Sequence, residues 1–385
     1  MNIAGMIKRE DFFNILQNTL TYYYRDIKNK DVAVSYSPFD GCEALCIYPF
    51  LGFISRRIVP RGARTYLYSE YNIRNSKLKY LIGKLLVFAA THSFGLGAKY
   101  KIYITRDLLG KNEFILPQNR SIRIFDYDSM TVDCVVKHGF SNKYFANQIN
   151  FRRDYSYDFV IKTLESGERY FKERIMLGNP LARVANNENY DRAQKQAVKY
   201  IDTLTTDTLH YVSVDEYAIP LIGRLREKML EAQENKQFSA FEIFHSIINY
   251  LEEYFSDKHF QIPVSMSHGD LQSGNIWLEK NGEVKIYDWE TAAERSVWYD
   301  RATLLYSTRR AGGLEAFCDE TDMTQVVKDN GTDAGEKDIK NIVILEDLAF
   351  YLDDVSELPL DFGTSIFDAY CNRLAKILEK EISCG

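Results

Sequence analysis

The sequence predicts an α+β fold in which a small antiparallel β lobe precedes a larger, mainly helical lobe. Two β-rich runs flank a polar turn within residues 121–137, as in a hairpin. Long amphipathic segments follow at 189–204 and 238–255. Between these regions, the Gly-x-Pro at 178–180 ends the strand-like pattern and begins a linker. We therefore expect two lobes with a cleft between them.

Size and composition agree with a large globular protein. The chain has 385 residues, which exceeds a usual single domain. Apolar residues make up 45% and charged residues 26%, an ordinary globular composition. The net charge of −6 argues against a protein that grips nucleic acid over its whole surface.

Three regions are expected along the chain. Residues 1–118 form an N-terminal accessory region, which has a helical pattern at its start, short strand-like runs and no recognisable site. Residues 119–181 form the small lobe and linker. This lobe contains the hairpin, a helix starting near a possible N-cap at Ser141, and two further strand-like runs at 157–164 and 168–177. Residues 182–385 form the larger helical lobe.

The cysteines and the apolar segments indicate a cytoplasmic protein. The six cysteines are scattered without the spacing of a metal site, which fits reduced thiols. The amino terminus becomes charged too early for a signal peptide, and no run of 18 uncharged apolar residues occurs.

One segment is strongly basic. Residues 56–84 carry eight Lys or Arg against one Glu, and a short apolar run follows at 85–98. The simpler interpretation is a solvated basic face next to a buried helix. The alternative is a site for an anionic substrate or an anionic membrane surface.

The stretch SHGDLQSGNIWLEKNGEVKIYDWE, residues 267–290, predicts a phosphoryl-transfer site. Its two strand-like runs are joined around Asn281-Gly282, a dipeptide typical of tight hairpins. The hairpin folds Asp288 back beside Asn275, and the preceding loop carries Asp270 into the same cleft. A lone Asp in a loop is usually a turn former, but the combination is more specific.

Phosphoryl transfer explains why these residue types occur together. The reaction needs nucleotide phosphates clamped by Mg²⁺ and an acceptor hydroxyl aimed by a carboxylate. Asp270 is the candidate for orienting the acceptor hydroxyl. Asn275 and Asp288 supply oxygen ligands for Mg²⁺, and Glu290 extends the acidic cluster towards a second ion.

These motifs resemble those of the aminoglycoside phosphotransferase and choline kinase branch of the protein-kinase-like fold. The matching residues are HGDLQSGN and IYDWE, with thirteen residues from Asn275 to Asp288. The resemblance covers roughly residues 119–385. It implies a two-lobed protein-kinase-like fold, ATP and Mg²⁺ as cofactors, and a small-molecule acceptor.

The resemblance also implies roles for residues of the small lobe. Lys137 matches the strand lysine that contacts the α- and β-phosphates. The helix glutamate that usually pairs with this lysine is replaced by Gln148, which gives up the ion pair. The backbone of Arg174, Ile175 and Met176 would face the adenine base.

Two further residues match supporting positions of the same family. His268 corresponds to the histidine that supports the geometry of the catalytic loop. Asp300 corresponds to the aspartate at a helix start that braces this loop.

The expected function is ATP-dependent transfer of the γ-phosphate to a hydroxyl of a sugar, an amino alcohol such as choline, or a glycan or lipid precursor. A nucleotide-binding pseudokinase scaffold is one alternative, suggested by Gln148. A kinase of a lipid-linked acceptor at a membrane surface is another, suggested by the basic segment. No nucleic-acid partner is expected, membrane contact is the less favoured prediction, and the oligomeric state is not indicated.

Overall fold

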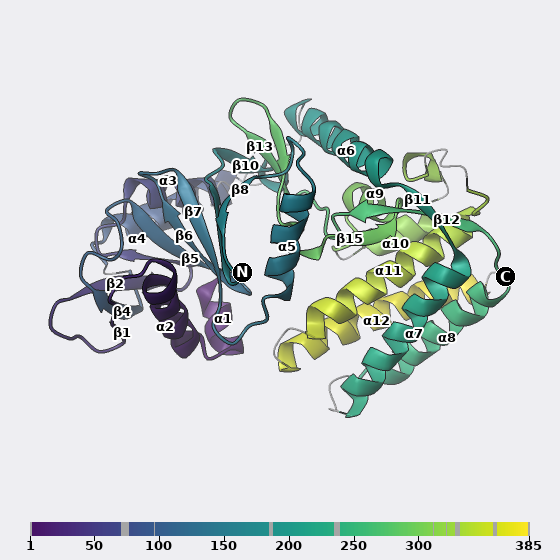
Figure 1. Cartoon of the computed structure of the whole chain (residues 1–385), viewed down its shortest axis with the longest axis horizontal. Coiled ribbons are helices and arrows are strands. Elements are labelled where there is room, and N and C mark those ends of the chain that lie inside the picture. The colour runs from purple at the N-terminus through teal and green to yellow at the C-terminus, as the bar shows by residue number, and fades with distance from the viewer. Residues whose placement is uncertain are drawn as a thin grey trace. The chain divides into compact units, whose positions relative to one another are not determined.

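The chain folds into two compact units (Figure 1). The computed structural model describes residues 2–70, 77–95, 97–184, 188–234, 239–310, 312–320, 322–327, 332–356 and 360–383. The first unit comprises Met1–Ala193 and Ile276–Glu290, and the second comprises Gln194–Asn275 and Thr291–Gly385. The loop with Asp270 therefore belongs to the second unit, and Asp288 belongs to the first.

An antiparallel sheet organises the first unit. Within the described residues its nine strands have the order β1-β4-β2-β3-β5-β6-β7-β9-β8. The strands are β1 (Val34–Ser35), β2 (Cys42–Tyr48), β3 (Phe53–Arg56), β4 (Tyr100–Thr105), β5 (Glu113–Pro117), β6 (Ser121–Asp126), β7 (Thr131–Val136), β8 (Thr163–Ser166) and β9 (Tyr170–Arg174). The predicted hairpin at 121–137 is confirmed as β6 and β7.

Helices cover both faces of this sheet. Helices α1 (Ile3–Arg9) and α2 (Phe12–Tyr22) pack on one face, followed by a short π-helix at Tyr23–Ile27. Helices α3 (Arg61–Glu70), α4 (Lys77–His92) and α5 (Lys143–Asp154) contribute to the apolar cluster on the other face. In Figure 1, α1 and α2 lie on the near side of the sheet, and α3 and α4 on the far side.

The alternating direction of side chains along each strand explains why both faces of the sheet carry an apolar core. Successive side chains of a strand point to opposite sides of a sheet. Ile122 and Ile124 of β6 accordingly join the core beneath α1 and α2. Val132 and Cys134 of β7 join the opposite core, together with Phe145 of α5.

The N-terminal helices are tied to β7 by buried polar contacts. Glu10 accepts a 2.5 Å hydrogen bond from Lys137, directly after β7. Asp133 accepts a 2.6 Å hydrogen bond from the hydroxyl of Tyr23. The predicted accessory region at 1–118 therefore does not form a separate part, because its strands and helices share one sheet and one core with the following residues.

A second sheet of the first unit carries the predicted hairpin of the site motif. It has the order β10-β13-β14 among the described strands, with β10 at Gly178–Pro180, β13 at Ile276–Glu279 and β14 at Val284–Ile286. Ile276 pairs with Ile286, so the hairpin returns the chain to the level of Ile276 just before Asp288. Gly282 has φ +89°, a conformation that favours glycine, and the prediction of a turn at Asn281-Gly282 is confirmed.

The second unit is mainly helical. Its helices are α6 (Glu188–Thr208, which begins in the first unit), α7 (Val214–Glu234), α8 (Phe241–Ser256), α9 (Tyr299–Tyr306), α10 (Gly313–Asp319), α11 (Glu336–Ser356) and α12 (Leu360–Ser383). A small sheet joins β11 (His210–Ser213), β12 (Gln261–Ser267) and β15 (Ala293–Ser296). The predicted helices at 189–204 and 238–255 are confirmed as α6 and α8, and so is the α+β fold class.

Helix α8 shows why these segments are helical. Its buried residues recur at helical spacing, so that they form one apolar stripe. This stripe packs into the core with residues of α7, α11 and α12. The stripe consists of Phe244, Ile247, Ile248, Leu251 and Phe255.

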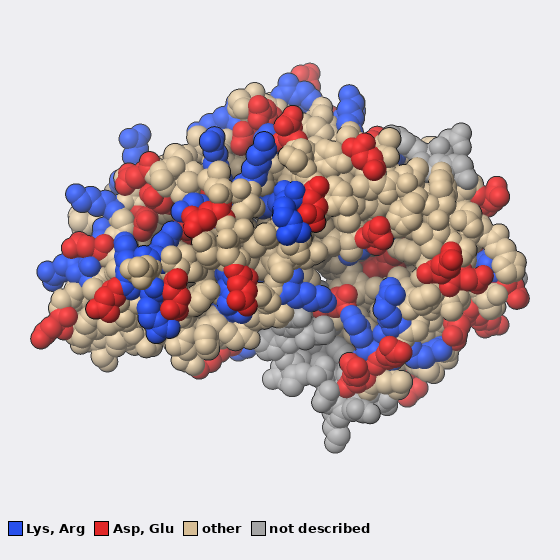
Figure 2. Space-filling model, in the orientation of Figure 1, with Lys and Arg blue, Asp and Glu red and all other residues tan. Residues whose placement is uncertain are grey.

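Charged side chains of both signs lie at the surface (Figure 2). Basic and acidic side chains are interspersed on the face shown in Figure 2. None of the helices in the described part of the chain combines the length and the apolar character needed to cross a bilayer.

Glu346 gives the second unit a pH-dependent stability. Its carboxylate accepts hydrogen bonds from Tyr217 and Ser296. Burial nevertheless raises the pKa of Glu346 from 4.5 to about 7, because it penalises the charged form more than these bonds stabilise it.

We predict that the free energy of unfolding contains a term of about 3 kcal/mol that is present below pH 4.5 and lost as the pH rises through 7. The folded state holds the proton more tightly than the unfolded state, so this term falls with rising pH. Urea denaturation between pH 4.5 and 7.5 should show a difference between wild type and Glu346→Gln that changes with pH. A pH-independent difference would contradict the assignment.

Candidate functional site

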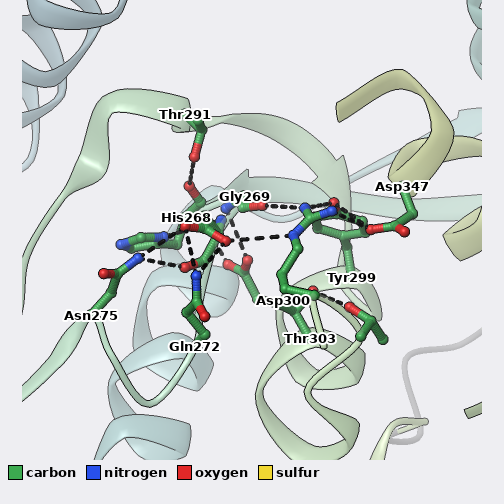
Figure 3. Close-up of polar contacts among 12 residues, drawn as sticks. His268, Gly269, Gln272, Asn275, Thr291, Tyr299, Asp300, Thr303 and Asp347 are labelled. Carbon is green, nitrogen blue, oxygen red and sulfur yellow. Dashed lines mark hydrogen bonds and ion pairs between the residues drawn. The ribbon is translucent and has the colours of Figure 1, made fainter. Parts of the chain in front are cut away.

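The loop after β12 is held in place by Asp300 (Figure 3). The buried carboxylate of Asp300, in the first turn of α9, accepts hydrogen bonds from the backbone N–H of His268 at 2.6 Å and of Gly269 at 3.0 Å. His268 supports the loop further, because its Nδ1 accepts the N–H of Asp270 at 3.2 Å. The predicted supporting roles of Asp300 and His268 are confirmed by these contacts.

Gly269 is required by the conformation of this loop. Its φ is +83°, which L-residues with a side chain rarely adopt. A Cβ at this position would lie 2.5 Å from the carbonyl oxygen of Thr291 and from the guanidinium of Arg295. Only glycine therefore fits directly before Asp270.

The carboxylate of Asp270 is fixed from three sides. Gln272 donates from Nε2 to both carboxylate oxygens at 3.1 Å. Asn275 donates to Oδ2 at 3.1 Å, and the Nε of Arg309 lies 3.4 Å from Oδ1. The side chain remains 23% exposed, so it is oriented and still accessible.

Asn275 presents an oxygen ligand. Its Nδ2 donates to the backbone carbonyl of Asp270 at 2.8 Å as well as to the carboxylate. Because Nδ2 makes both of these bonds, Oδ1 of the same amide is on the other side of the group, and Figure 3 shows this oxygen of Asn275 pointing to the side opposite its nitrogen. An amide oxygen held in this way is suited to a hard cation such as Mg²⁺.

Arg309 is a further residue of this site that the sequence motifs do not indicate. Besides its ion pair with Asp270, it donates to the carboxylate of Asp347, to the hydroxyl of Tyr299 and, at 2.9 Å, to the carbonyl of Gly269. Its guanidinium lies 3.4 Å from the ring centre of Phe350. Burial opposes the charge, but Asp347 and its neighbours hold the pKa of Arg309 above its usual value. Arg309 follows α9 without any local pattern that could have indicated this role.

In the first unit, Asp288 has a strained backbone. Its φ is +69°, which is uncommon for a residue other than glycine. The following Trp289 is fully buried and stacks on Phe151 with ring centres 4.0 Å apart, which fixes the chain at this point. Among the described residues, no hydrogen bond or ion pair engages the carboxylate of Asp288. A strained position with an unengaged carboxylate is typical of a functional residue.

Asp288 and Glu290 line the same cavity of the first unit. The cavity has a volume of ≈ 710 Å³ and is also lined by Asn119, Arg120 and Arg183. Glu290 accepts an ion-paired contact from Arg120 at 3.3 Å, and its backbone carbonyl accepts from Asn147 at 3.0 Å. The site is polar and contains charges of both signs.

Carboxylate and amide oxygens, such as those of Asp288 and Asn275, are ligand types that hard cations such as Mg²⁺ prefer. Across the described ranges, no group of three or more His, Cys, Asp and Glu side chains forms a metal-binding cluster. Mg²⁺ is usually bound by one or two carboxylates together with substrate phosphates and water, so it does not require such a cluster.

The structure does not support the predicted role of Lys137. Its side chain is 1% exposed, and Nζ donates to Glu10 at 2.5 Å and to the carbonyl of Asn119 at 3.1 Å. Burial lowers the pKa of Lys137, while Glu10 raises it. Its carboxylate partner is thus Glu10 of the N-terminal region. Gln148 is buried, and its Nε2 has no partner among the described residues.

A different cation lies near Asp288. Arg123 of β6 stands opposite Cys134, so it points to the α5 face of the sheet. Burial disfavours its charge, but Cys134, Glu173 and Asp288 raise the pKa of Arg123. Its Nε is buried without a hydrogen-bond partner in the described part of the chain. No local motif distinguishes Arg123 from the other arginines of the strands.

The segment predicted to face adenine follows β9. Arg174 is the last residue of this strand and pairs with Thr131. The N–H of Ile175 donates to the carbonyl of Met130 at 3.0 Å, so it is not available to a base. The backbone of Met176 makes no hydrogen bond to the described residues. Of the three predicted residues, Met176 thus has the freest backbone.

Comparisons with known proteins give similar structures. Neither the family models nor the curated proteins match this chain. The apo form of a thermostable mutant of aminoglycoside phosphotransferase APH(4)-Ia is 11% identical, with a TM-score of 0.46 over 69% of this chain and 94% of its own. An ethanolamine kinase from Plasmodium vivax is 13% identical, with a TM-score of 0.44 over 81% of this chain and 93% of its own. Choline kinase LicA from Streptococcus pneumoniae is 13% identical, with a TM-score of 0.45 over 71% and 91%. All three are small-molecule kinases, the class that the motif around Asp270 resembles.

Replacing Asp300 should destabilise the protein. In Asp300→Ala the buried N–H of His268 loses its acceptor, and the N–H of Gly269 keeps only the hydroxyl of Ser267 at 3.1 Å, which together cost about 2 kcal/mol or more. The exposed Asp319, at the end of α10, provides the control, since Asp319→Ala should change stability by less than about 0.5 kcal/mol. Urea denaturation measures both. Equal effects of the two substitutions would show that the contacts of Asp300 are not stabilising.

Replacing Asp288 should reveal the strain of its backbone. Both Asp288→Gly and Asp288→Ala remove the carboxylate, but only glycine adopts φ +69° without a steric penalty. We expect the glycine variant to be more stable than the alanine variant by about 1 kcal/mol in urea denaturation. An alanine variant of equal or greater stability would mean that residue 288 is not strained.

Proposed function

We propose that the protein is an ATP- and Mg²⁺-dependent phosphotransferase that acts on a hydroxyl group of a small molecule. The observation that carries this proposal is the fixed carboxylate of Asp270. Gln272, Asn275 and Arg309 orient it, and Asp300 fixes the backbone on which it is placed. A turn-forming Asp does not need such support.

In this reaction the carboxylate of Asp270 accepts a hydrogen bond from the hydroxyl group of the acceptor. Its accessible oxygen accepts the hydroxyl hydrogen and aims the oxygen lone pair at the phosphorus atom. The guanidinium of Arg309, whose Nε lies 3.4 Å from Oδ1, attracts the carboxylate and helps to orient it for this hydrogen bond.

Asn275, Asp288 and Glu290 are the proposed Mg²⁺ ligands. Asn275 offers Oδ1, and Asp288 offers a carboxylate that no described side chain engages. When bound, the ion would neutralise charge on the phosphates of ATP. Arg120 and Arg183 in the cavity beside Asp288 supply further positive charge for an anionic ligand. The backbone of Met176 is the proposed contact for the base.

The acceptor is a sugar, an amino alcohol, or a glycan or lipid precursor. These compounds share a hydroxyl group that a carboxylate can orient. The acceptor pocket of such a fold depends on loops without a transferable motif, so the residues named above do not distinguish among them.

A nucleotide-binding scaffold without turnover is a second candidate. The buried pair of Lys137 and Glu10 favours it, because a lysine bonded to Glu10 does not reach phosphates unless that contact breaks. The two functions differ in one property, namely the formation of a phosphorylated product.

Asp270→Asn should lower turnover by about 10²-fold or more while nucleotide binding stays within about twofold, since positioning of a general base contributes 10² to 10⁴. Asp257→Asn, at an exposed helix end, is the matched control and should leave both unchanged. The measurement is consumption of ATP by the purified protein against a panel of sugars, amino alcohols and aminoglycosides, with product detected by mass spectrometry. Nucleotide binding without product from any acceptor would favour the scaffold, and full activity of Asp270→Asn would remove Asp270 from its role.

A further inference from the structure

Helix α4 exposes most of its apolar side chains. Leucine, isoleucine and phenylalanine residues along the helix are between 47% and 67% exposed. They follow helical spacings of three and four residues, so they form one broad apolar face. The exposed residues are Leu78, Leu81, Ile82, Leu85, Leu86 and Phe88.

Among the described residues of α4, a stripe of buried residues faces the rest of the first unit, and Ala90 also packs against it. Gly83, Val87 and Thr91 are buried and recur every four residues. Val87 packs in the core with residues of β2, β3 and α3. The exposed apolar residues of α4 lie outside this stripe. Continuous exposed apolar surface usually marks an interaction site.

A groove extends this face. Between α4 and the turn after β2 lies a cavity of ≈ 490 Å³, whose lining includes Leu51, Leu86, Ala89 and Ala90. Phe50 at its rim is 75% exposed. The apolar surface is therefore concave at one edge, where a hydrocarbon chain can pack.

The surroundings of α4 are basic. Residues 44–106 contain eleven Lys or Arg and one acidic residue, Glu70, although the whole chain has a net charge of −6. Arg57 and Arg64 reach the carboxyl end of α4, where Arg57 donates to the carbonyl of Phe94 at 2.7 Å and Arg64 lies 3.3 Å from His92. Positive charge therefore adjoins the apolar face.

Arg61 is exposed and lies one turn before Arg64 in α3, the helix that contacts α4. We propose that this surface, formed by the exposed apolar residues of α4 and by Arg57, Arg61 and Arg64, binds an anionic lipid bilayer. The combination of an apolar helix face and neighbouring cations supplies the two attractions that bind an interfacial helix to anionic lipid. With 16 residues, α4 is about 24 Å long, so it lies in the interface and does not span the bilayer.

The positive charge of this surface favours an anionic bilayer over a second copy of the chain as its partner. In a symmetric dimer the same patch would face itself, and its cations would repel one another. An anionic lipid surface attracts those cations and accepts the apolar side chains at the same time. The inference does not depend on the proposed phosphotransferase activity.

Vesicle sedimentation tests the proposal with the full chain. We expect wild type to bind vesicles of phosphatidylcholine mixed equally with phosphatidylglycerol, and to bind vesicles of phosphatidylcholine alone at least about tenfold more weakly. Leu81→Glu/Leu85→Glu and Arg61→Glu/Arg64→Glu should each weaken binding to the mixed vesicles by about tenfold or more.

Matched variants separate this surface from general changes in hydrophobicity and charge. Leu164→Glu/Leu230→Glu alters two leucines that are 48% and 53% exposed, and Lys195→Glu/Lys199→Glu reverses two exposed lysines of α6. Both should bind like wild type, and circular dichroism should show that all variants are folded.

Wild type that does not sediment with mixed vesicles, or α4 variants that bind as well as wild type, would overturn the proposal. A dimer in analytical ultracentrifugation that Leu81→Glu/Leu85→Glu dissociates, without vesicle binding, would assign the face to a second copy instead.

Discussion

The two hydrogen bonds that Asp300 accepts from the backbone of the loop are the contact on which the site in the second unit depends. They satisfy adjacent N–H groups in a buried place where water does not reach. They also require a glycine at 269, because the backbone turns through a positive φ there. Asp270 follows directly, so its position is set by a side chain from a helix that begins about thirty residues later.

A polar network formed by the loop after α9 and by helices α11 and α12 supports this arrangement. Arg309, which follows α9, binds Asp347 of α11, and Asp347 accepts a 2.9 Å hydrogen bond from Tyr370 of α12. A buried charge is costly unless it is paired and hydrogen-bonded. Here the arginine has a carboxylate on either side, Asp347 and Asp270. The orientation of Asp270 is thereby coupled to the packing of the helical core.

The sequence predicts the features that depend on interactions between residues close together in the chain. The hairpin around Asn281-Gly282 and the amphipathic helix α8 follow from turn chemistry and from helical periodicity. Asp300 was found because the motif around it resembles a known family. Arg309 and the partner of Lys137 could not be found in this way, because their contacts join residues far apart in the sequence. Glu10 lies 127 residues from Lys137, and no periodicity records such a pairing.

The same limitation explains the misplaced boundary at residue 118. Strand β5 ends at Pro117 and β6 begins at Ser121, so residues 118–120 are a turn within one sheet and not a junction between domains. A short run of polar residues, such as 118–120, occurs both in turns within a sheet and in linkers between domains. The order of the strands in the sheet, which local sequence does not encode, decides between them.

Strands β1–β5 lie within residues 1–118 and pair in the same sheet as β6 and β7, so these residues cannot be removed without exposing the sheet. A fragment that starts at residue 119 would lose β5, and β6 would become a free edge with unpaired backbone groups. Ile122, Ile124 and Val135 would lose the helices that cover them. Lys137 would also be left without Glu10. Such a fragment would aggregate, so recombinant work on this protein needs the chain from its first helix onward.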